Sequence, residues 1–329
     1  MKLTRRTLGL LGLTLTAGIT PFAAAAAEDF PSRPVQLIVP YAPGGSGDLI
    51  GRLLGDKLST LWGQQVVVEN RPGAGGLIGT ETAAHAPADG YTLYLATDGP
   101  LTVAASLHGH VPYDWKRDLT PVSMVTVGYQ VLIVDPKLPV QTLADFIALA
   151  QSKPGALNFA SIGVGTAPHL AAELFLSIAH LKLTHVPYNG SSAQAIRALI
   201  AGDVAMFMVG TSTAVPFIKN GNVRALAVTS SSHRVDELPD VPTFAEAGLP
   251  QVDYSLWFAI EAPSATPPDI VNKLNADINT VVADRDYQQA LRARGFEAKG
   301  DTPEELAAFM EKDYIKNRDL IQKLGLHVD

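Results

Sequence analysis

The 329-residue chain contains no cysteine. This absence excludes disulfide bonds, thiol nucleophiles and cysteine-ligated zinc from any account of the protein. The chain also has no heptad run and no repeat of fixed period, which excludes a coiled coil and a repeat architecture. Hydrophobic residues make up 47% of the chain, an ordinary fraction for a soluble globular protein. The length is comfortable for two domains, each with a core of its own.

Basic residues are scarce relative to acidic ones. The chain has 25 Lys and Arg against 32 Asp and Glu, a net charge of −7. Three of the bases and none of the acids lie in the first 27 residues, so the remainder has 22 bases against 32 acids and a net charge of −10. Nucleic acid is therefore excluded as a partner, because its phosphates demand a basic face. The chain also exerts no long-range attraction on an anion, so an anion site has to be built from local groups.

The N-terminal segment has the composition of an export signal. Lys2, Arg5 and Arg6 precede an apolar stretch over residues 8–19, and an alanine-rich run ends at Ala27. This order predicts a signal peptide over residues 1–27, cleaved near Ala27, and a mature protein in the periplasm. The pair of arginines is compatible with the twin-arginine route and equally with the Sec route. The apolar stretch is short for a retained membrane anchor.

Beyond the signal, short apolar runs alternate with helical patterns. Strands are expected at residues 35–39, 66–68 and 92–96, and the same alternation resumes between residues 131 and 228. Strands separated by helices predict parallel sheets and hence an α/β fold.

The C-terminal part has too few strands to fold alone. One expected strand, at residues 256–261, precedes three helical patterns. We therefore expect this part to complete the first sheet. The predicted organisation is lobe 1 from residues 28–127 and 255–329, and lobe 2 from residues 128–254.

Two strand-to-helix turns carry the candidate chemistry. Residues 40–48 and 160–169 each contain a pair of glycines and a hydroxyl residue, Ser46 or Thr166, at the expected helix N-cap. Free N–H groups at such turns form anion sites, and ligands of open α/β sheets lie beyond the carboxyl ends of the strands. Two such turns facing each other across a cleft would hold an anion without a salt bridge. A well-capped turn without a ligand is the alternative for each, and His169 either touches the ligand or packs beneath its loop.

Enzymatic motifs are incomplete. The glycines of residues 69–79 follow a G-x-G-x-x-x-G spacing without the later acid of a dinucleotide site, so this segment is interpreted as a cleft-edge loop. Residues 44–48 end in Asp where a nucleophile elbow needs Gly. His108 and His110 lack further metal ligands nearby. No enzymatic activity, cofactor or metal is therefore expected.

Several motifs in a fixed order give the chain a family resemblance, from about Phe30 to the C-terminus. The chain resembles the Bug family, the periplasmic receptors of tripartite tricarboxylate transporters. The motifs include Tyr41-Ala-Pro-Gly-Gly45 with Asp48 and Arg52, Val67-Val-Glu-Asn-Arg-Pro-Gly-Ala-Gly-Gly76, Ser161-x-Gly-x-Gly165 with His169, His185-Val-Pro-Tyr188, Leu238-Pro-Asp-Val-Pro-Thr243 and Thr302-Pro-Glu-Glu305.

The resemblance implies a two-lobed type II periplasmic-binding-protein fold that closes on a carboxylate held in the cleft between the lobes. The implied partners are the small carboxylate and the integral membrane subunits of the transporter, and we expect a monomer. The family's ligand-binding loop residues correspond here to Tyr41, Ala42, Pro43, Gly44, Gly45, Ser46, Asp48, Ser161, Gly163, Gly165, Thr166 and His169. A second set expected near the cleft comprises Ala74, Gly75, Thr97, Tyr129, Gln130, Tyr188 and Met208.

The sequence leaves the ligand open. Di- and tricarboxylates, acidic amino acids and aromatic acids all fit the sequence. If Tyr41, Tyr129 and Met208 line the pocket, they favour a ligand with an apolar body. If these residues belong to the core instead, they carry no information about the ligand. Gln130 stands where the family usually has Pro, and Ala205 where Asp is common, so the ligand of a relative does not transfer safely. The alternative functions are a receptor that presents its ligand to a membrane sensor, and a nucleotide-dependent or hydrolytic enzyme.

Overall fold

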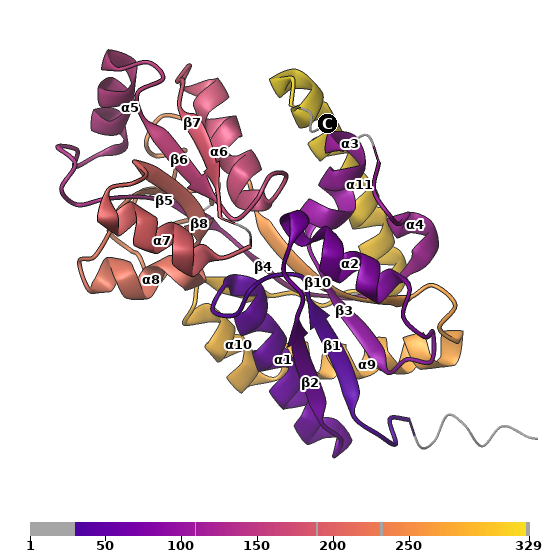
Figure 1. The fold of residues 1–329 in the computed structure, drawn as a ribbon. Helices are drawn as coiled ribbons and strands as arrows, with labels where there is room; N and C mark the ends of the chain where they lie inside the picture. The colour runs from indigo at the N-terminus through magenta and orange to yellow at the C-terminus, as the bar shows by residue number, and fades with distance from the viewer. Residues whose placement is uncertain (1–29, 109, 189, 231–232, 327–329) are drawn as a thin grey trace, which may run out of the picture. The chain divides into compact units, whose positions relative to one another are not determined.

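A computed structural model describes residues 30–108, 110–188, 190–230 and 233–326. The chain divides into two units, Met1–Phe30 and Pro31–Asp329, and the second unit contains both β-sheets (Figure 1). The predicted signal peptide at residues 1–27 lies outside the described residues. None of the helices in the described ranges is long and apolar enough to cross a membrane.

The first sheet has six strands in the order β11-β4-β10-β3-β1-β2. Strand β1 is parallel to β2 and β3, whereas β10 runs antiparallel to both β3 and β4. The predicted parallel pairing holds for β1, β2 and β3, but the sheet as a whole is mixed, because the chain leaves it along β4 and re-enters it along β10 in the opposite direction. The strands are β1 (Val35–Val39), β2 (Val66–Asn70), β3 (Thr92–Ala96), β4 (Leu119–Gly128), β10 (Leu256–Pro263) and β11 (Phe296–Ala298).

The second sheet has five strands in the order β7-β6-β8-β5-β9. Strand β6 is parallel to β7 and β8, and β5 is antiparallel to β8 and β9, so this sheet is mixed as well. Its strands are β5 (Gln130–Val134), β6 (Asn158–Ser161), β7 (Thr184–Pro187), β8 (Met206–Gly210) and β9 (Arg224–Val228).

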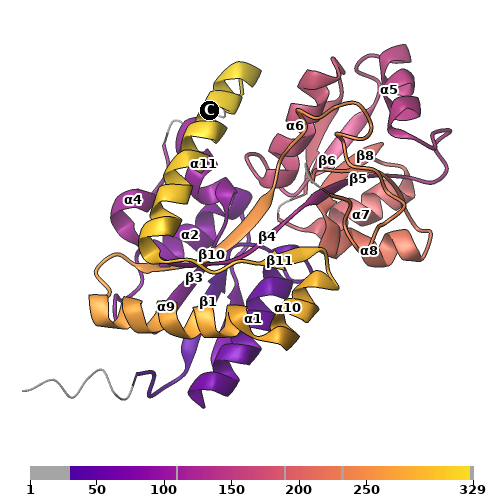
Figure 2. The ribbon, with the colours of Figure 1, turned by 180° about the vertical axis from the view of Figure 1, so that it is seen from behind.

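Helices pack against each sheet. Helices α1, α9 and α10 contact one another on the first sheet (Figure 2), and α2 and α11 share a core cluster that contains Tyr94 and Trp257. Helices α7 and α8 share the core cluster of the second sheet, around Phe207. The helices are α1 (Ser46–Trp62), η1 (Ala74–Gly76), α2 (Leu77–Ala84), η2 (Gly99–Val103), α3 (Ala104–Leu107), α4 (Trp115–Asp118), α5 (Leu143–Ser152), α6 (Ala167–Ile178), α7 (Ser192–Ala201), α8 (Thr211–Lys219), α9 (Pro268–Ala283), α10 (Arg285–Arg292) and α11 (Pro303–Leu324).

The chain passes between the two sheets twice, from β4 to β5 and from β9 to β10. The Thr229 hydroxyl joins the two crossings, because it accepts the backbone N–H of Gln130 at 3.0 Å and donates to the Tyr254 carbonyl at 2.9 Å. Paired crossings tied in this way are a suitable place for a hinge.

The sequence predicted the N-cap of α11 correctly and that of α9 incorrectly. The predicted capping box at Thr302 is confirmed, with reciprocal hydrogen bonds between Thr302 and Glu305. The prediction that Thr266 caps α9 is wrong. Pro267 occupies the cap position, and the Thr266 hydroxyl donates instead to the Pro263 carbonyl at 2.7 Å.

Candidate functional site

Four helices begin around one cavity. Two come from turns that the sequence singled out, α1 with Ser46 and Gly47 and α6 with Ala167, and two come from turns that it did not, α7 with Ser192 and α8 with its cap residue Gly210. Each of these helices follows the carboxyl end of a strand, in the first sheet for α1 and in the second sheet for the other three. The cavity therefore lies between the two sheets, at the strand ends where α/β folds bind ligands.

Helix N-termini, and no basic side chain of the described lining residues, supply the positive charge at the cavity. A helix N-terminus carries roughly half a positive charge, concentrated on N–H groups of the first turn that have no acceptor within the helix. The N–H groups of Ser46 and Gly47 belong to this class, and both residues line the cavity. The lining residues within the described ranges include no Lys, Arg or His. Backbone dipoles are therefore the source of attraction for an anion here.

The walls combine hydroxyl groups with apolar surface. The cavity volume is about 40 Å³, which is room for about one to three water molecules. Any ligand larger than that has to separate the walls on entering. The lining residues are Tyr41, Gly45, Ser46, Gly47, Thr97, Asp98, Ile162, Ala167, Pro168, Gly190, Ser192, Val209, Gly210, Leu256 and Phe258.

The Ser46 side chain connects the two sheets. The expectation that Ser46 caps α1 is wrong, because Gly45 holds the cap position and no side chain caps this helix. The Ser46 Oγ instead lies 2.7 Å from the Oγ of Ser212 and 3.3 Å from the Oγ1 of Thr213, in the first turn of α8. Both hydrogen bonds cross between the sheets, so they depend on the close approach of α1 and α8.

The second loop is held together by its own side chains. Thr166 occupies the N-cap position of α6 as predicted, but its hydroxyl donates to the Gly163 carbonyl at 2.7 Å and caps nothing. The Ser161 Oγ accepts the N–H of Gly163 at 3.0 Å and lies 2.6 Å from the His185 Nε2. None of these residues lines the cavity, so they shape the loop beneath it.

His169 packs beneath this loop. Its Nδ1 accepts the N–H of Gly165 at 3.1 Å, and its ring stacks on that of His185 with the ring centres 4.1 Å apart. Burial, and then the neighbouring His185, lower the pKa of His169 to about 3. The ring is therefore neutral near pH 7 and contributes a hydrogen-bond acceptor to the loop.

Asp48 stabilises the loop at residues 40–48 through contacts outside the cavity. Its Oδ2 accepts the N–H of Gly44 at 3.0 Å, and its Oδ1 pairs with the Arg52 guanidinium at 2.9 Å. Burial opposes ionisation of Asp48, but the hydrogen bonds from Arg52 and Gly44 outweigh it and lower its pKa. Asp48 and Arg52 do not line the cavity, so they act on the loop that forms it.

Some of the remaining predicted residues line the cavity, and the others lie outside its lining. Tyr41 and Thr97 line the cavity and are joined by a hydrogen bond of 3.0 Å between their hydroxyl groups. Gln130 is buried, and its Nε2 donates to the carbonyl of Ala167, so it positions the start of α6. Met208 is fully buried in the core. The predicted residues that lie outside the cavity lining are Ala42, Pro43, Gly44, Asp48, Ala74, Gly75, Tyr129, Gln130, Ser161, Gly163, Gly165, Thr166, His169, Tyr188 and Met208.

Gly75 nevertheless has a role at the contact between the sheets. Its φ of +66° favours glycine, and a Cβ at this position would lie 2.8 Å from the carbonyl oxygen of Val164 in the second loop. The loop at residues 69–79 therefore approaches the loop at residues 161–169 backbone to backbone.

The turns before α7 and α8, which line the cavity from the second sheet, were not identified from the sequence. Gly190 with Ser192, and Gly210 with Thr211, repeat the combination of a glycine and a hydroxyl residue after a strand. The same signal that identified the first two turns was present in both. Asp98, directly after Thr97, was missed as well, and it is the only carboxylate among the described lining residues.

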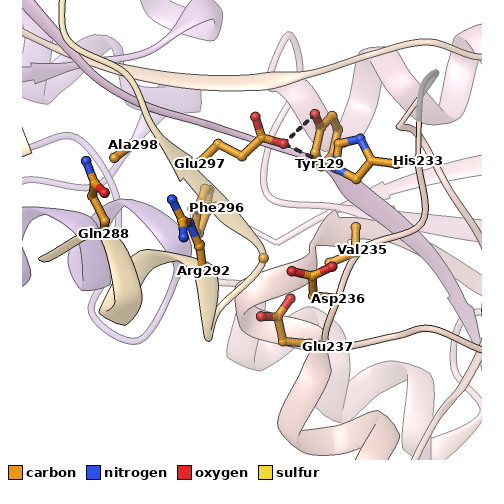
Figure 3. Close-up of a pocket in the computed structure, with 11 residues that line it drawn as sticks. Tyr129, His233, Val235, Asp236, Glu237, Gln288, Arg292, Phe296, Glu297 and Ala298 are labelled. Atoms are coloured by element: carbon orange, nitrogen blue, oxygen red, sulfur yellow. Dashed lines mark hydrogen bonds and ion pairs between the residues drawn. The ribbon is translucent and has the colours of Figure 1, made fainter. Parts of the chain in front are cut away.

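A larger cavity, of about 400 Å³, lies elsewhere and has a different chemistry (Figure 3). Gln288 and Arg292 of α10 lie on one side, and Asp236 and Glu237 lie on the other. The Glu297 Oε1 accepts a hydrogen bond of 3.0 Å from the Tyr129 hydroxyl and lies 3.3 Å from the His233 Nε2. The three acidic side chains outnumber the one arginine, Arg292, so this cavity is less suited to a carboxylate, and the smaller cavity is the candidate anion site.

The fold and the smaller cavity define a class of protein. Two α/β sheets joined by paired crossings, with helix N-termini from both sheets around one cavity, form the architecture of periplasmic binding proteins. Comparison with solved structures supports this class. The periplasmic binding protein BugD is 31% identical with a TM-score of 0.86, over 91% of this chain and 99% of that one. An R. palustris protein solved with adipate is 33% identical with a TM-score of 0.87, over 91% and 99%.

Sequence comparison identifies the family. Residues 50–326 match the family described as the tripartite tricarboxylate transporter family receptor. Protein BugT of Bordetella pertussis is 39% identical over 322 residues, which is 97% of this chain and 98% of that protein. MatC from Rhodopseudomonas palustris, solved with bound malate, is 31% identical with a TM-score of 0.83, over 89% and 100%. The chain belongs to this receptor family, whose members are periplasmic solute-binding proteins, and the predicted family and fold class are confirmed.

Proposed function

We propose that the protein captures a small carboxylate in the periplasm and delivers it to the membrane subunits of a tripartite tricarboxylate transporter. One observation carries the proposal. Four helix N-termini, from two sheets, surround a cavity that has no basic lining residue among those described. Such a site suits an anion that has to be released again, because backbone dipoles attract it without a strong ion pair.

The apolar part of the wall narrows the class of carboxylate. Ile162, Val209, Leu256 and Phe258 face the same cavity as the hydroxyl groups of Tyr41 and Thr97. A carboxylate with an apolar body fits this combination better than a fully polar tricarboxylate. Two similar proteins were solved with adipate and with malate, which supports the general class of ligand.

Capture requires opening and closure. The cavity is too small for such ligands as it stands, and a hydrogen bond between Ser46 at its edge and Ser212 of α8 joins the two sheets. We propose that residues 28–127 with 255–329 move as one lobe and residues 128–254 as the other, about the crossings joined by Thr229. A ligand that is held only in the closed form shifts the population toward that form.

A thermal-shift screen tests the proposal. The panel contains adipate, malate, glutamate and benzoate, each paired with its neutral amide as a matched control. A ligand at about 100 times its Kd adds about 2.7 kcal/mol of stability, so a true ligand raises the Tm whereas its amide does not. Equal stabilisation by the acids and their amides would contradict an anion site.

Export is tested separately. The proposed cleavage near Ala27 predicts that the protein isolated from the periplasmic fraction begins at about residue 28, which N-terminal sequencing determines. Recovery of a chain that still begins at Met1 would contradict the proposed processing.

A further inference from the structure

Asp98 is the one acidic residue among the described residues that line the candidate cavity. Asp98 follows β3, lines the cavity beside Tyr41 and Thr97, and is only 3% exposed. The described lining residues include no base that would neutralise it. An ionised Asp98 would therefore repel the carboxylate that the four helix N-termini attract.

The hydrogen bonds around Asp98 fit a neutral carboxyl group. The Tyr254 hydroxyl lies 2.8 Å from the Asp98 Oδ2 and 3.2 Å from the Asn317 Oδ1. A hydroxyl group has one hydrogen, so it cannot donate fully to two acceptors at once. A proton on the Asp98 Oδ2 resolves the conflict, because Asp98 then donates to Tyr254 and Tyr254 donates to Asn317.

The orientation of Asn317 is fixed by its other contacts. Its Nδ2 donates to the Asp313 Oδ2 at 2.9 Å and to the Thr102 Oγ1 at 3.1 Å. A reversed amide would place its carbonyl oxygen against the Asp313 carboxylate. The Asn317 oxygen therefore faces Tyr254 and acts as an acceptor.

Asp313 is the partner that keeps the negative charge. Its Oδ2 accepts hydrogen bonds from Thr102 at 2.6 Å, from the Trp257 Nε1 at 3.2 Å and from Asn317. Burial raises the pKa of Asp313, while these three donors on one oxygen and the charge of Lys316 oppose the rise and favour the ionised form. A second negative charge on Asp98, in the same buried network, would be unfavourable.

The surroundings of Asp98 shift its pKa in opposite directions. Burial, and then the charge of Asp313, raise the pKa of Asp98 to about 7, while hydrogen bonds from Tyr254 and Gly99 and the charge of Lys316 oppose the rise. Tyr41 also faces Asp98, and burial raises its pKa far enough to keep it neutral. Asp98 is therefore positioned to gain a proton when a further negative charge approaches.

We propose that Asp98 is the proton-binding residue of the carboxylate site, neutral in the liganded receptor and taking up one proton per carboxylate bound at alkaline pH. This inference rests on the proposed function. Because the anion favours protonated Asp98, protonated Asp98 must favour the anion to the same extent. The affinity is then constant below about pH 6 and falls by up to about tenfold per pH unit above the pKa of the free receptor.

Calorimetry tests the coupling between about pH 6.5 and pH 9, where adipate and malate, the two probes, are fully ionised. In wild type, the Kd is expected to rise above about pH 7, and two buffers of different ionisation enthalpy should report uptake of up to one proton. In Asp98→Asn the amide still donates to Tyr254, so the variant should bind with a Kd independent of pH and take up no proton. Equal pH slopes in wild type and Asp98→Asn would overturn the inference.

Glu261 offers a matched control. It is fully buried on β10, its two carboxyl oxygens have no hydrogen-bond partner among the described residues, and burial raises its pKa to about 8. Glu261 does not line the cavity. Glu261→Gln should therefore keep the pH slope of the wild-type Kd, and loss of that slope in this variant would count against Asp98 as the coupled group.

An infrared measurement needs no ligand. In the difference spectrum between wild type and Asp98→Asn, the carbonyl-stretching band of a protonated carboxyl group should be present at about pH 6 and weaken as the pH rises through about 7, while the band of Glu261, which both proteins share, cancels. Its absence at pH 6 would overturn the inference whatever the ligand is. Failure of every carboxylate to bind at every pH would overturn the proposed function together with the coupling, whereas binding with equal slopes would overturn the coupling alone.

Discussion

The two cavities attract ligands by different means. The smaller one is surrounded by helix N-termini and hydroxyl groups, and its positive charge comes from the backbone. The larger one is surrounded by Arg292, Asp236, Glu237 and Glu297, and its charge comes from side chains. Volume alone would select the larger cavity, at about 400 Å³ against about 40 Å³. The chemistry selects the smaller one, because fixed dipoles attract an anion there, whereas the larger cavity has three acidic side chains against one arginine.

This difference explains why a receptor can lack a basic residue at its anion site. Backbone dipoles are set by the fold and carry no flexible side chain that has to be ordered on binding. The arrangement depends instead on the accurate placement of turns, which Asp48, His169 and Gln130 provide from outside the cavity. Substitutions in the lining and in these supporting residues should therefore have different signatures.

Filling each cavity with an indole gives the largest expected contrast. Ile162→Trp occupies the smaller cavity, so carboxylate affinity should fall at least about 100-fold, equivalent to about 2.7 kcal/mol. Gln288→Trp places the same ring in the larger cavity and should leave the Kd within about threefold. Calorimetry on both folded variants measures the contrast, and the opposite pattern would assign the ligand to the larger cavity.

Removing the negative charge of Asp48, which supports the loop at residues 40–48, should lower the stability of the fold. Asp48→Asn weakens the bonds to Gly44 and Arg52, so the free energy of unfolding at pH 7 should fall by about 1.5–3 kcal/mol. The pKa of Asp48 is lowered in the folded protein. Its stabilisation is therefore present above the unfolded value of about 3.9 and is lost as the pH falls through the folded pKa.

Urea denaturation at several pH values checks this sign. The difference between wild type and Asp48→Asn should shrink as the pH is lowered below about 4. Asp56→Asn is the matched control, because Asp56 is exposed on the same helix. A difference that grows at acidic pH would show that Asp48 does not stabilise the loop as an ionised group.

The hydroxyl groups of Ser46 and Thr166 have different roles, since the first forms hydrogen bonds between the two sheets and the second forms one within a loop. Ser46→Ala removes the bonds to Ser212 and Thr213, which form only when the sheets approach, so the Kd should rise about 3- to 10-fold. Thr166→Ala removes the bond to the Gly163 carbonyl within one loop, so it should lower stability by about 1 kcal/mol with a smaller change in Kd. Calorimetry and denaturation of both variants decide the matter, and a larger loss of affinity in Thr166→Ala would show that Thr166 contacts the ligand.

The strand pattern was readable from the sequence where strands are continuous apolar runs. The predicted strands at residues 35–39 and 92–96 coincide with β1 and β3. Strand β4 was not predicted, because its ten residues include Pro121 and the polar Ser123. Ser123 is nevertheless buried, with its Oγ 2.9 Å from the Met124 carbonyl oxygen and 3.3 Å from that of Asp301. A partner as distant in sequence as Asp301 leaves no local signal.

The candidate site was readable only in part. The glycine and hydroxyl pattern located the turns at the starts of α1 and α6 correctly, because helix starts have a local signature. The direction of each hydroxyl depended on tertiary partners, as with Ser46 and Ser212, which are 166 residues apart. The chemistry of Asp98 depends likewise on Tyr254 and Asn317, so no local pattern could have indicated it.

The smallest expected effect belongs to the larger cavity. Tyr129→Phe removes the hydrogen bond to the Glu297 carboxylate and keeps the ring, which contacts the His233 ring edge-on with the centres 5.6 Å apart. The carboxylate is about half exposed, so solvent replaces much of the lost bond and the free energy of unfolding should fall by at most about 1 kcal/mol. Because Tyr129 lies outside the smaller cavity, the Kd should stay within about threefold of wild type. Calorimetry and denaturation of this one variant measure both quantities. A tenfold loss of affinity in a folded protein would mean that the larger cavity takes part in ligand binding, and the contrast between backbone-built and side-chain-built sites would then no longer assign the function.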